Sequence, residues 1–273
     1  MKAYLILLIT SIHSIMITSA QSKTISTGIG DIAVHIKVNS SENTPAIFLH
    51  GVYFDHHLWD KQTEAINDRT VITVDMPLHG ESNKNIKKIW TLSDCADMLI
   101  TILDSLHVNK VIAVGHSWGS MTILRAASKH PERFQSIGFC NMPFKEMPKA
   151  QKMMFNMQHS MLIFKNFYMN VTGKVALFGK ESVKQHPELL DFLKASMSKL
   201  SNADIRRIDK YVVTGADDAT ELIKSLKVNA LALKGKDDYV PIPDPIKTTI
   251  VNGGHASPIE SPDDVIAFCL KLF

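Results

Sequence analysis

The stretch 111–119, VIAVGHSWG, decides the fold class of this chain. Its first four residues are apolar and predict a strand that is buried on both faces. A G-x-S-x-G pattern follows at once, and a helical period begins at residue 118. A serine between a buried strand and a helix must occupy a sharp, strained turn, for which small flanking residues leave room. The stretch therefore predicts a nucleophile elbow with Ser117 at its tip.

Further apolar runs of the same kind alternate with helical periods along the chain. The runs are 46–49, 70–74, 134–140, 228–233 and 248–251, and the clearest helical periods are 91–107 and 118–130. Such alternation predicts an α/β fold with a mostly parallel, doubly wound sheet. The alternation stops over residues 142–226, which are helical in pattern. We therefore expect a core of residues 21–141 and 227–273 with a helical cap of residues 142–226 inserted into it.

A serine hydroxyl becomes a useful nucleophile only when a base takes its proton. The chain has twelve histidines, but His255 alone follows the last predicted strand on a glycine-bounded loop, just before the last helix. A carboxylate must then hold the imidazole in the right tautomer. Asp237 and Asp238 follow the fifth run, and both are candidates. The backbone N–H of Trp118, at the start of a helix, is placed to donate to an oxyanion.

Together these motifs resemble the α/β-hydrolase superfamily, in its serine-nucleophile branch of carboxylesterases and lipases. Residues 50–52 (HGV) resemble the family's oxyanion loop, which implies that the N–H of Val52 is the second oxyanion donor. Residues 75–82 (DMPLHGES) resemble its D-x-x-G-x-G-x-S turn, with Leu78 in place of the first glycine. In the family the acid lies three residues after a glycine, which selects Asp238 over Asp237.

The chain departs from the family pattern between the acid and the base. Asp238 and His255 are closer in sequence than the family usually has them, and Pro241, Pro243 and Pro245 lie between them. Proline opposes a helix in its interior. We expect the helix that usually precedes the last strand to be reduced to a turn.

Composition excludes several other classes of protein. The 273 residues are 45% hydrophobic and 21% charged, as in a globular protein. The net charge is only +3 and there is no Lys/Arg block, so no nucleic-acid partner is expected. The 3 cysteines are too few for a disulfide framework, and buried free thiols are favoured. No metal and no organic cofactor is predicted.

The first twenty residues read as a secretory signal peptide. Lys2 is followed by a mostly apolar stretch, 3–17, and Thr18 and Ala20 are the small residues of a cleavage site. A membrane anchor is the weaker alternative, because the stretch is shorter than the ~20 residues that span a bilayer. We expect cleavage after Ala20 and a secreted or periplasmic protein without a stable membrane anchor.

The resemblance implies a serine hydrolase whose partner is a small-molecule carboxylic ester with a small to medium, apolar or aromatic acyl group. Eight of the 13 methionines lie in the predicted cap, and flexible thioethers suit an adaptable apolar pocket. Three other readings stay open: an aminopeptidase or amidase, which would need cap carboxylates in the pocket; a C–C hydrolase; and a ligand-binding receptor with a vestigial triad. Candidate pocket-lining residues are His50, Tyr53, His116, Met142, Met154 and Met157.

Overall fold

The computed structural model describes residues 20–273, so the predicted signal peptide lies outside the described residues except for Ala20. Eight strands form one sheet in the order β1-β2-β4-β3-β5-β6-β7-β8. The first two strands pair antiparallel, as do β2 and β4, and every later pairing is parallel. The strands are β1 (Ala20–Ser26), β2 (Asp31–Lys37), β3 (Ala46–Leu49), β4 (Val71–Val74), β5 (Val111–His116), β6 (Phe134–Cys140), β7 (Ala230–Gly235) and β8 (Lys247–Val251).

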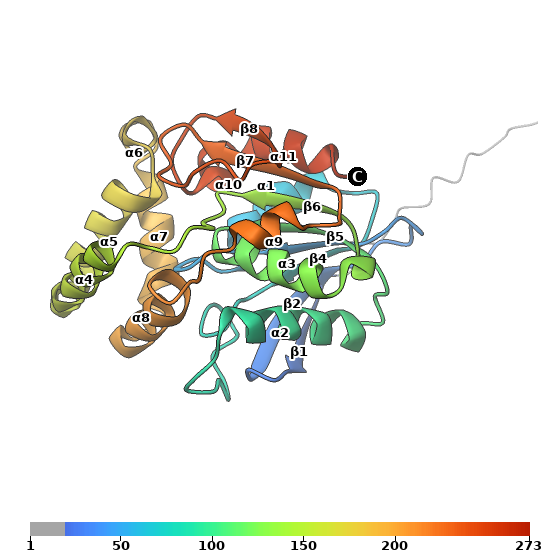
Figure 1. Ribbon diagram of the computed structural model, residues 1–273, viewed down its shortest axis with the longest axis horizontal. Coiled ribbons are helices and arrows are strands. Elements are labelled where there is room, and N and C mark those ends of the chain that lie inside the picture. Colours follow the sequence, from blue (N-terminus) through green and yellow to red (C-terminus); the bar gives the residue numbers. More distant parts are fainter. Residues whose placement is uncertain (1–19) are drawn as a thin grey trace, which may run out of the picture.

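Helices cover both faces of this sheet (Figure 1). Helices α2 and α3 pack against each other on one face, and α1 packs against α11 on the other. These helices and the short ones beside them are η1 (His56–Trp59), α1 (Asp60–Ala65), α2 (Leu92–Ser105), α3 (Trp118–Lys129), η2 (Pro131–Arg133), α10 (Ser257–Glu260) and α11 (Pro262–Leu270). The predicted α/β class with a doubly wound sheet is confirmed.

Strands β1 and β2 were not predicted. β1 lies at the edge of the sheet, and from Gln21 to Ser26 only Ile25 is buried. An edge strand pairs on one side only, so its side chains need not be apolar, and its sequence lacks the continuous apolar run that marks the central strands. The six predicted runs correspond to β3 through β8. The expected burial was wrong for β8, which is the other edge strand and has only Val251 buried.

Between β6 and β7 the regular elements are all helices, and apart from α9, which packs against α3, they project beyond the sheet (Figure 1). Two of them, η4 and η5, are π-helical turns, a rare geometry that is frequent at functional sites. The helices are α4 (Lys149–Gln158), η3 (His159–Phe164), α5 (Lys165–Thr172), η4 (Gly173–Leu177), α6 (Lys180–Gln185), α7 (Glu188–Ser198), α8 (Asn202–Ile208), η5 (Asp209–Val213) and α9 (Thr220–Lys224). We call this segment the cap.

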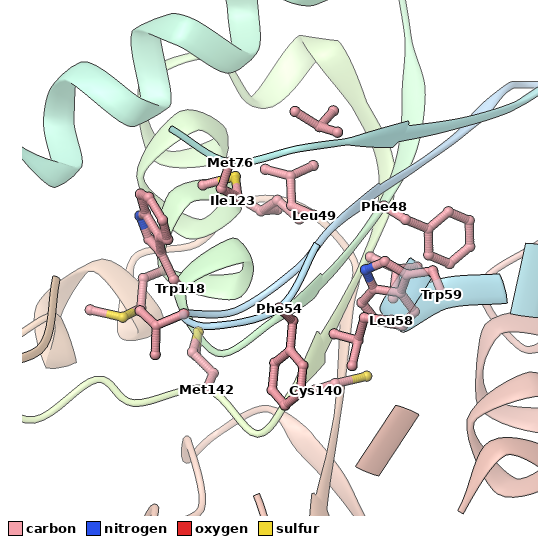
Figure 2. Packing of buried hydrophobic residues seen from close by; sticks show 14 of the residues in the cluster. Phe48, Leu49, Phe54, Leu58, Trp59, Met76, Trp118, Ile123, Cys140 and Met142 are labelled. Atoms are coloured by element: carbon pink, nitrogen blue, oxygen red, sulfur yellow. The ribbon is translucent and has the colours of Figure 1, made fainter. Parts of the chain in front are cut away.

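The core is continuous across the sheet. Figure 2 shows buried side chains from several elements packed together, among them Leu49 of β3, Met76 after β4 and Ile123 of α3. The three cysteines are buried and unpaired, as predicted: Cys95, Cys140 and Cys269. Burial raises the pKa of each thiol, which keeps it protonated and unreactive. In the described part of the chain, no helix is long and apolar enough to cross a membrane.

Candidate active site

Ser117 occupies the sharp turn that the sequence predicts between β5 and α3. Its backbone has a φ of 49° and a ψ of −110°, a conformation that costs energy for a residue with a Cβ. The glycines beside it are required by close backbone contacts. A Cβ on Gly119 would lie 2.1 Å from the carbonyl oxygen of Leu49, and one on Gly115 would lie 2.4 Å from the amide nitrogen of Ser120. The turn thus depends on both glycines.

The structure brings Ser117, His255 and Asp238 into one hydrogen-bonded chain. The Ser117 Oγ lies 2.9 Å from His255 Nε2, and His255 Nδ1 lies 2.9 Å from Asp238 Oδ1. The three residues follow β5, β8 and β7, which are parallel, so they meet at the carboxyl edge of the sheet. With its Nδ1 proton donated to the carboxylate, the neutral imidazole is left with Nε2 free to accept the serine proton.

Asp238 is held as an anion by several donors. Asn141 donates from Nδ2 to Asp238 Oδ2 at 2.8 Å, and the N–H of Val240 donates to Oδ1 at 3.2 Å. Burial raises the pKa of Asp238, but the charge and hydrogen bond of His255 and these two donors lower it further, so the pKa lies below its usual value. The neighbouring Asp237 is exposed. Residues 236–246 contain no helix, and the shortened segment still brings Asp238 to the histidine.

The loop after β3 is fixed by two neutral histidines. His50 donates from Nδ1 to the carbonyl of Gly51 at 2.7 Å and accepts at Nε2 from the N–H of Met76 at 2.9 Å. His79 accepts at Nε2 from the N–H of Tyr53 at 2.9 Å. Burial lowers the pKa of His79 to about 3, so its ring stays neutral and keeps this acceptor. The loop is thereby held rigidly next to Ser117.

The two predicted oxyanion donors, the backbone N–H groups of Val52 and Trp118, belong to residues that lie close to Ser117. Val52 and Ser117 line the same cavity. Trp118 is the first residue of α3, so its N–H has no acceptor within the helix. Its indole ring is buried and stacked on Trp90, with ring centroids 5.3 Å apart, which leaves the backbone amide as the group that can serve the site.

A cavity of about 220 Å³ opens above Ser117 and His255. Its wall is mainly apolar, and both π-helical turns contribute to it. Polar side chains are few and include Lys145, Glu146 and Gln151. The remaining lining residues come from the core loops and the cap: Val52, Tyr53, Met121, Pro143, Phe144, Met147, Pro148, Phe155, Thr172, Ala176, Leu177, Val212, Val213, Ala216, Tyr239, Val240 and Pro241.

Of the six residues predicted to line the pocket, Tyr53 does so and the others do not. His50 and His116 are buried beneath the cavity, where their rings bond backbone groups. His116 donates from Nε2 to the carbonyl of His255 at 2.7 Å. Met142 is buried in the hydrophobic core, as Figure 2 shows. These three side chains support the site from below.

The prediction for Met154 and Met157 was wrong because it ignored the rotation of α4. Their side chains are 61% and 67% exposed. Gln151 and Phe155, four residues apart and therefore on one face of the helix, line the cavity. Met157 projects from the other side of the helix and Met154 from its flank, so neither reaches the cavity.

Three further residues of the site were missed. Asn141 follows β6 at the same sheet edge, and Tyr239 stacks on the His255 ring with centroids 4.9 Å apart. Asp209, in the cap, is fully buried and binds the Tyr53 hydroxyl and, at 2.8 Å, His159 Nε2. Burial raises the pKa of Asp209 more than these hydrogen bonds lower it. The position of Asn141 directly after β6 and that of Tyr239 next to Asp238 could have indicated these two residues, whereas the sequence around Asp209 gives no such indication.

Two groups of side chains among residues 20–273 contain possible metal ligands, and neither lines the cavity. One is Asp55, His56 and His57, and the other is His35, His56 and Asp75. In the second, the imidazoles are stacked with centroids 3.6 Å apart and 22° between planes. Their nitrogens bind different oxygens of Asp75, at 3.1 and 2.9 Å. Stacked rings cannot both direct lone pairs at one ion, so this arrangement is a hydrogen-bonded one.

Comparison with known proteins places this geometry in a family. A family model of the alpha/beta hydrolase fold matches residues 44–263. A 3-oxoadipate enol-lactonase of Acinetobacter baylyi is 34% identical over 48% of this chain and 46% of its own. The matched stretch thus spans about half the length of that relative. An enol-lactonase of Burkholderia xenovorans has a TM-score of 0.80 at 16% identity, covering 92% of this chain and 99% of its own.

An esterase of Thermogutta terrifontis has a similar fold, with a TM-score of 0.76 at 20% identity over 92% of this chain and 97% of its own. At these identities the solved structures bear on the fold alone. The family model covers most of the chain, from the strand before the oxyanion loop to the start of the last helix. The chain belongs to the family of proteins with the alpha/beta hydrolase fold.

Proposed function

We propose that the protein is a serine hydrolase that cleaves carboxylic esters with a small to medium, apolar or aromatic acyl group. One observation carries the proposal: Ser117, His255 and Asp238 form a hydrogen-bonded chain whose serine end opens into an apolar cavity. Export by cleavage after Ala20 is part of the proposal and rests on the sequence of residues 1–20 alone.

The reaction would proceed through an acyl-enzyme. Ser117 Oγ attacks the ester carbonyl while His255 takes its proton at Nε2, and Asp238 stabilises the imidazolium. The N–H groups of Val52 and Trp118 bind the developing oxyanion, and the loss of one such donor costs about 3 kcal/mol in the barrier. His255 then protonates the departing alcohol. Water repeats the sequence and releases the acid.

The names of two similar proteins are consistent with cleavage of a carboxylic ester. One relative is called an enol-lactonase and one structural neighbour an esterase, and a lactone is a cyclic carboxylic ester. The size and apolar wall of the cavity favour an uncharged acyl group, because a charged one would lose its hydration without gaining a buried partner.

A chain-length series of p-nitrophenyl esters tests the proposal. We expect turnover to rise with acyl length while added carbons fill the cavity, and to fall once the acyl group exceeds it. Turnover of none of the esters by a folded protein would contradict the proposed reaction. Tight binding of one ligand with negligible turnover would instead support a receptor with a vestigial triad.

The aminopeptidase reading finds little support among the cap carboxylates. Only Glu146 borders the cavity, and it pairs with Lys152 at 2.8 Å. Three further candidate acids of the cap are exposed and paired with basic neighbours outside the cavity: Glu181, Glu188 and Asp191. A free substrate amine would therefore meet no dedicated buried anion. The C–C hydrolase reading shares the triad and is tested by the same ester series.

Asp209 ties the oxyanion loop to the cap, and its effect can be measured separately. We expect Tyr53→Phe, which removes the hydroxyl that binds Asp209, to lower kcat about tenfold through a displaced loop. Tyr168 bonds both Asp209 and Tyr53, whereas His159, on η3, bonds the other carboxylate oxygen of Asp209, so His159→Gln is the matched control. The kcat for p-nitrophenyl butyrate should fall for the first variant and change little for the second. Equal effects would mean that Asp209 acts only on stability.

A further inference from the structure

Exposed apolar side chains are concentrated on one part of the cap. They come from α4, η3, α5 and η4, consecutive elements that contact one another and lie at the outer end of the molecule (Figure 1). A monomeric protein rarely exposes a large group of such side chains without a function. The residues, which we call the cap patch, are Met153 (62% exposed), Met154 (61%), Met157 (67%), Ile163 (78%), Phe164 (72%), Phe167 (58%) and Val175 (80%).

Helix α4 shows how the cap patch is oriented. Gln151 and Phe155 face the cavity. Met153 and Met157 lie on the other side of the helix and Met154 on its flank, and all three are exposed. The helix is therefore apolar on two sides, one of which encloses the substrate cavity. Packing within this chain explains the apolar side chains on the cavity side of α4. It does not explain those on the outer side, which are exposed.

Lysine predominates among the charged side chains near the cap patch. Residues 147–180 contain five lysines and no aspartate or glutamate. Lys149 and Lys174 are exposed, and Lys149 lies one and two turns before Met153 and Met157 on the same face of α4. Lys152 pairs with Glu146.

We propose that the cap patch docks on an anionic lipid surface. Exposed Met, Ile and Phe side chains accompanied mainly by lysine are the composition of segments that lie in the headgroup region of a bilayer. The apolar groups would enter the boundary of the acyl chains, and the lysines would remain among the anionic headgroups. A second copy of the chain is the poorer partner, because two surfaces with an excess of lysine would repel each other.

The position of the cap patch has a consequence that rests on the proposed function. The same elements supply Phe155, Thr172 and Ala176 to the cavity wall. An apolar ester dissolved in the lipid would then reach Ser117 along an apolar path. Docking itself does not require Ser117 to be active.

Co-sedimentation with lipid vesicles tests docking directly. We expect the full chain to bind vesicles that contain phosphatidylglycerol, and to bind pure phosphatidylcholine vesicles more weakly. The variant Met154→Ser/Ile163→Ser/Phe167→Ser should bind the anionic vesicles at least tenfold more weakly. The matched control is Ile89→Ser/Ile250→Ser/Leu270→Ser, which removes side chains of 73%, 50% and 57% exposure outside the cap and should leave binding unchanged.

A second pair of variants tests the contribution of the lysines to vesicle binding. Each lysine near an anionic surface strengthens binding roughly fivefold, so Lys149→Ala/Lys174→Ala should weaken binding at least tenfold. Lys23→Ala/Lys88→Ala, at exposed positions outside the cap, is the control and should bind as the parent does. The parent and all variants contain residues 1–19, so any contribution of these residues to vesicle binding cancels when the variants are compared with the parent.

Three outcomes would overturn docking: no binding to either kind of vesicle, equal losses in a variant and its control, or a concentration-dependent dimer that only the cap-patch variant abolishes. Ser117→Ala separates docking from catalysis. Vesicle binding by that variant at the parent level, with hydrolysis lost, supports both proposals. Vesicle binding by a parent protein that hydrolyses no ester would contradict the proposed function and leave docking standing.

Discussion

Replacing Ser117 by alanine is expected to lower ester turnover by about 10⁴-fold or more while the protein stays folded. The variant loses the only atom that can form the acyl-enzyme, and the oxyanion donors and the cavity remain. The side chain of Ser117 contributes one hydrogen bond, to His255, so its loss should cost no more than about 1 kcal/mol of stability. Steady-state kcat and thermal unfolding measure the two quantities on one preparation.

Ser120→Ala is the matched control for that variant. Ser120 is buried one turn further along α3, and its hydroxyl donates to the carbonyls of Gly115 and Cys140 at 2.6 and 3.3 Å. It does not line the cavity. We expect a stability loss of about 1 kcal/mol with turnover retained. If Ser117→Ala turned over the ester as fast as the parent, Ser117 would not be the nucleophile.

Replacing Asp238 by asparagine should lower kcat by about 10⁴-fold, as the same change does in serine proteases with this triad. The carboxylate is the acceptor for His255 Nδ1–H, and an amide can present an N–H there and force the other tautomer. Nε2 would then carry a proton and could not act as a base. Asp237→Asn, an exposed neighbour, is the control and should retain turnover.

The same variant has a predicted pH signature in stability. The pKa of Asp238 in the folded protein is below its usual value, so its ionised form stabilises the fold at pH above about 4, and this contribution is lost as the pH falls further. The difference in unfolding free energy between the parent and Asp238→Asn should therefore shrink below about pH 4. A constant difference would indicate that the charge of Asp238 does not contribute. Denaturant titration at several pH values measures this.

The parts of the site that could be predicted are those tied to strand ends. Ser117 and Asp238 follow apolar runs, and His255 follows the edge strand β8, in which only Val251 is buried. Parallel strands bring their carboxyl ends to one edge whatever the length of the intervening segments. Asn141 and Tyr239 lie at the same edge but belong to none of the sequence motifs that indicate the triad. Edge strand β1 was not predicted, because most of its side chains are exposed and its sequence contains no continuous apolar run.

The cap could be predicted only as a helical segment. Which face of α4 turns toward the cavity depends on how the helix packs, and residues 149–158 are apolar on two sides. Methionines on the outer side therefore looked like pocket residues. Asp209 is a further case, because an acidic residue in a helix usually faces water, and its burial arises from contacts with Tyr53 and His159 that are distant in sequence.

Labelling with a fluorophosphonate tests the central claim most directly, because the reagent bonds covalently to a serine only when its base and oxyanion donors are in place. Peptide mass spectrometry of the labelled protein should show one adduct, on Ser117, and His255→Ala should prevent it. A folded protein that takes up no label, or that carries it on another residue, would contradict the assignment of Ser117 as the nucleophile.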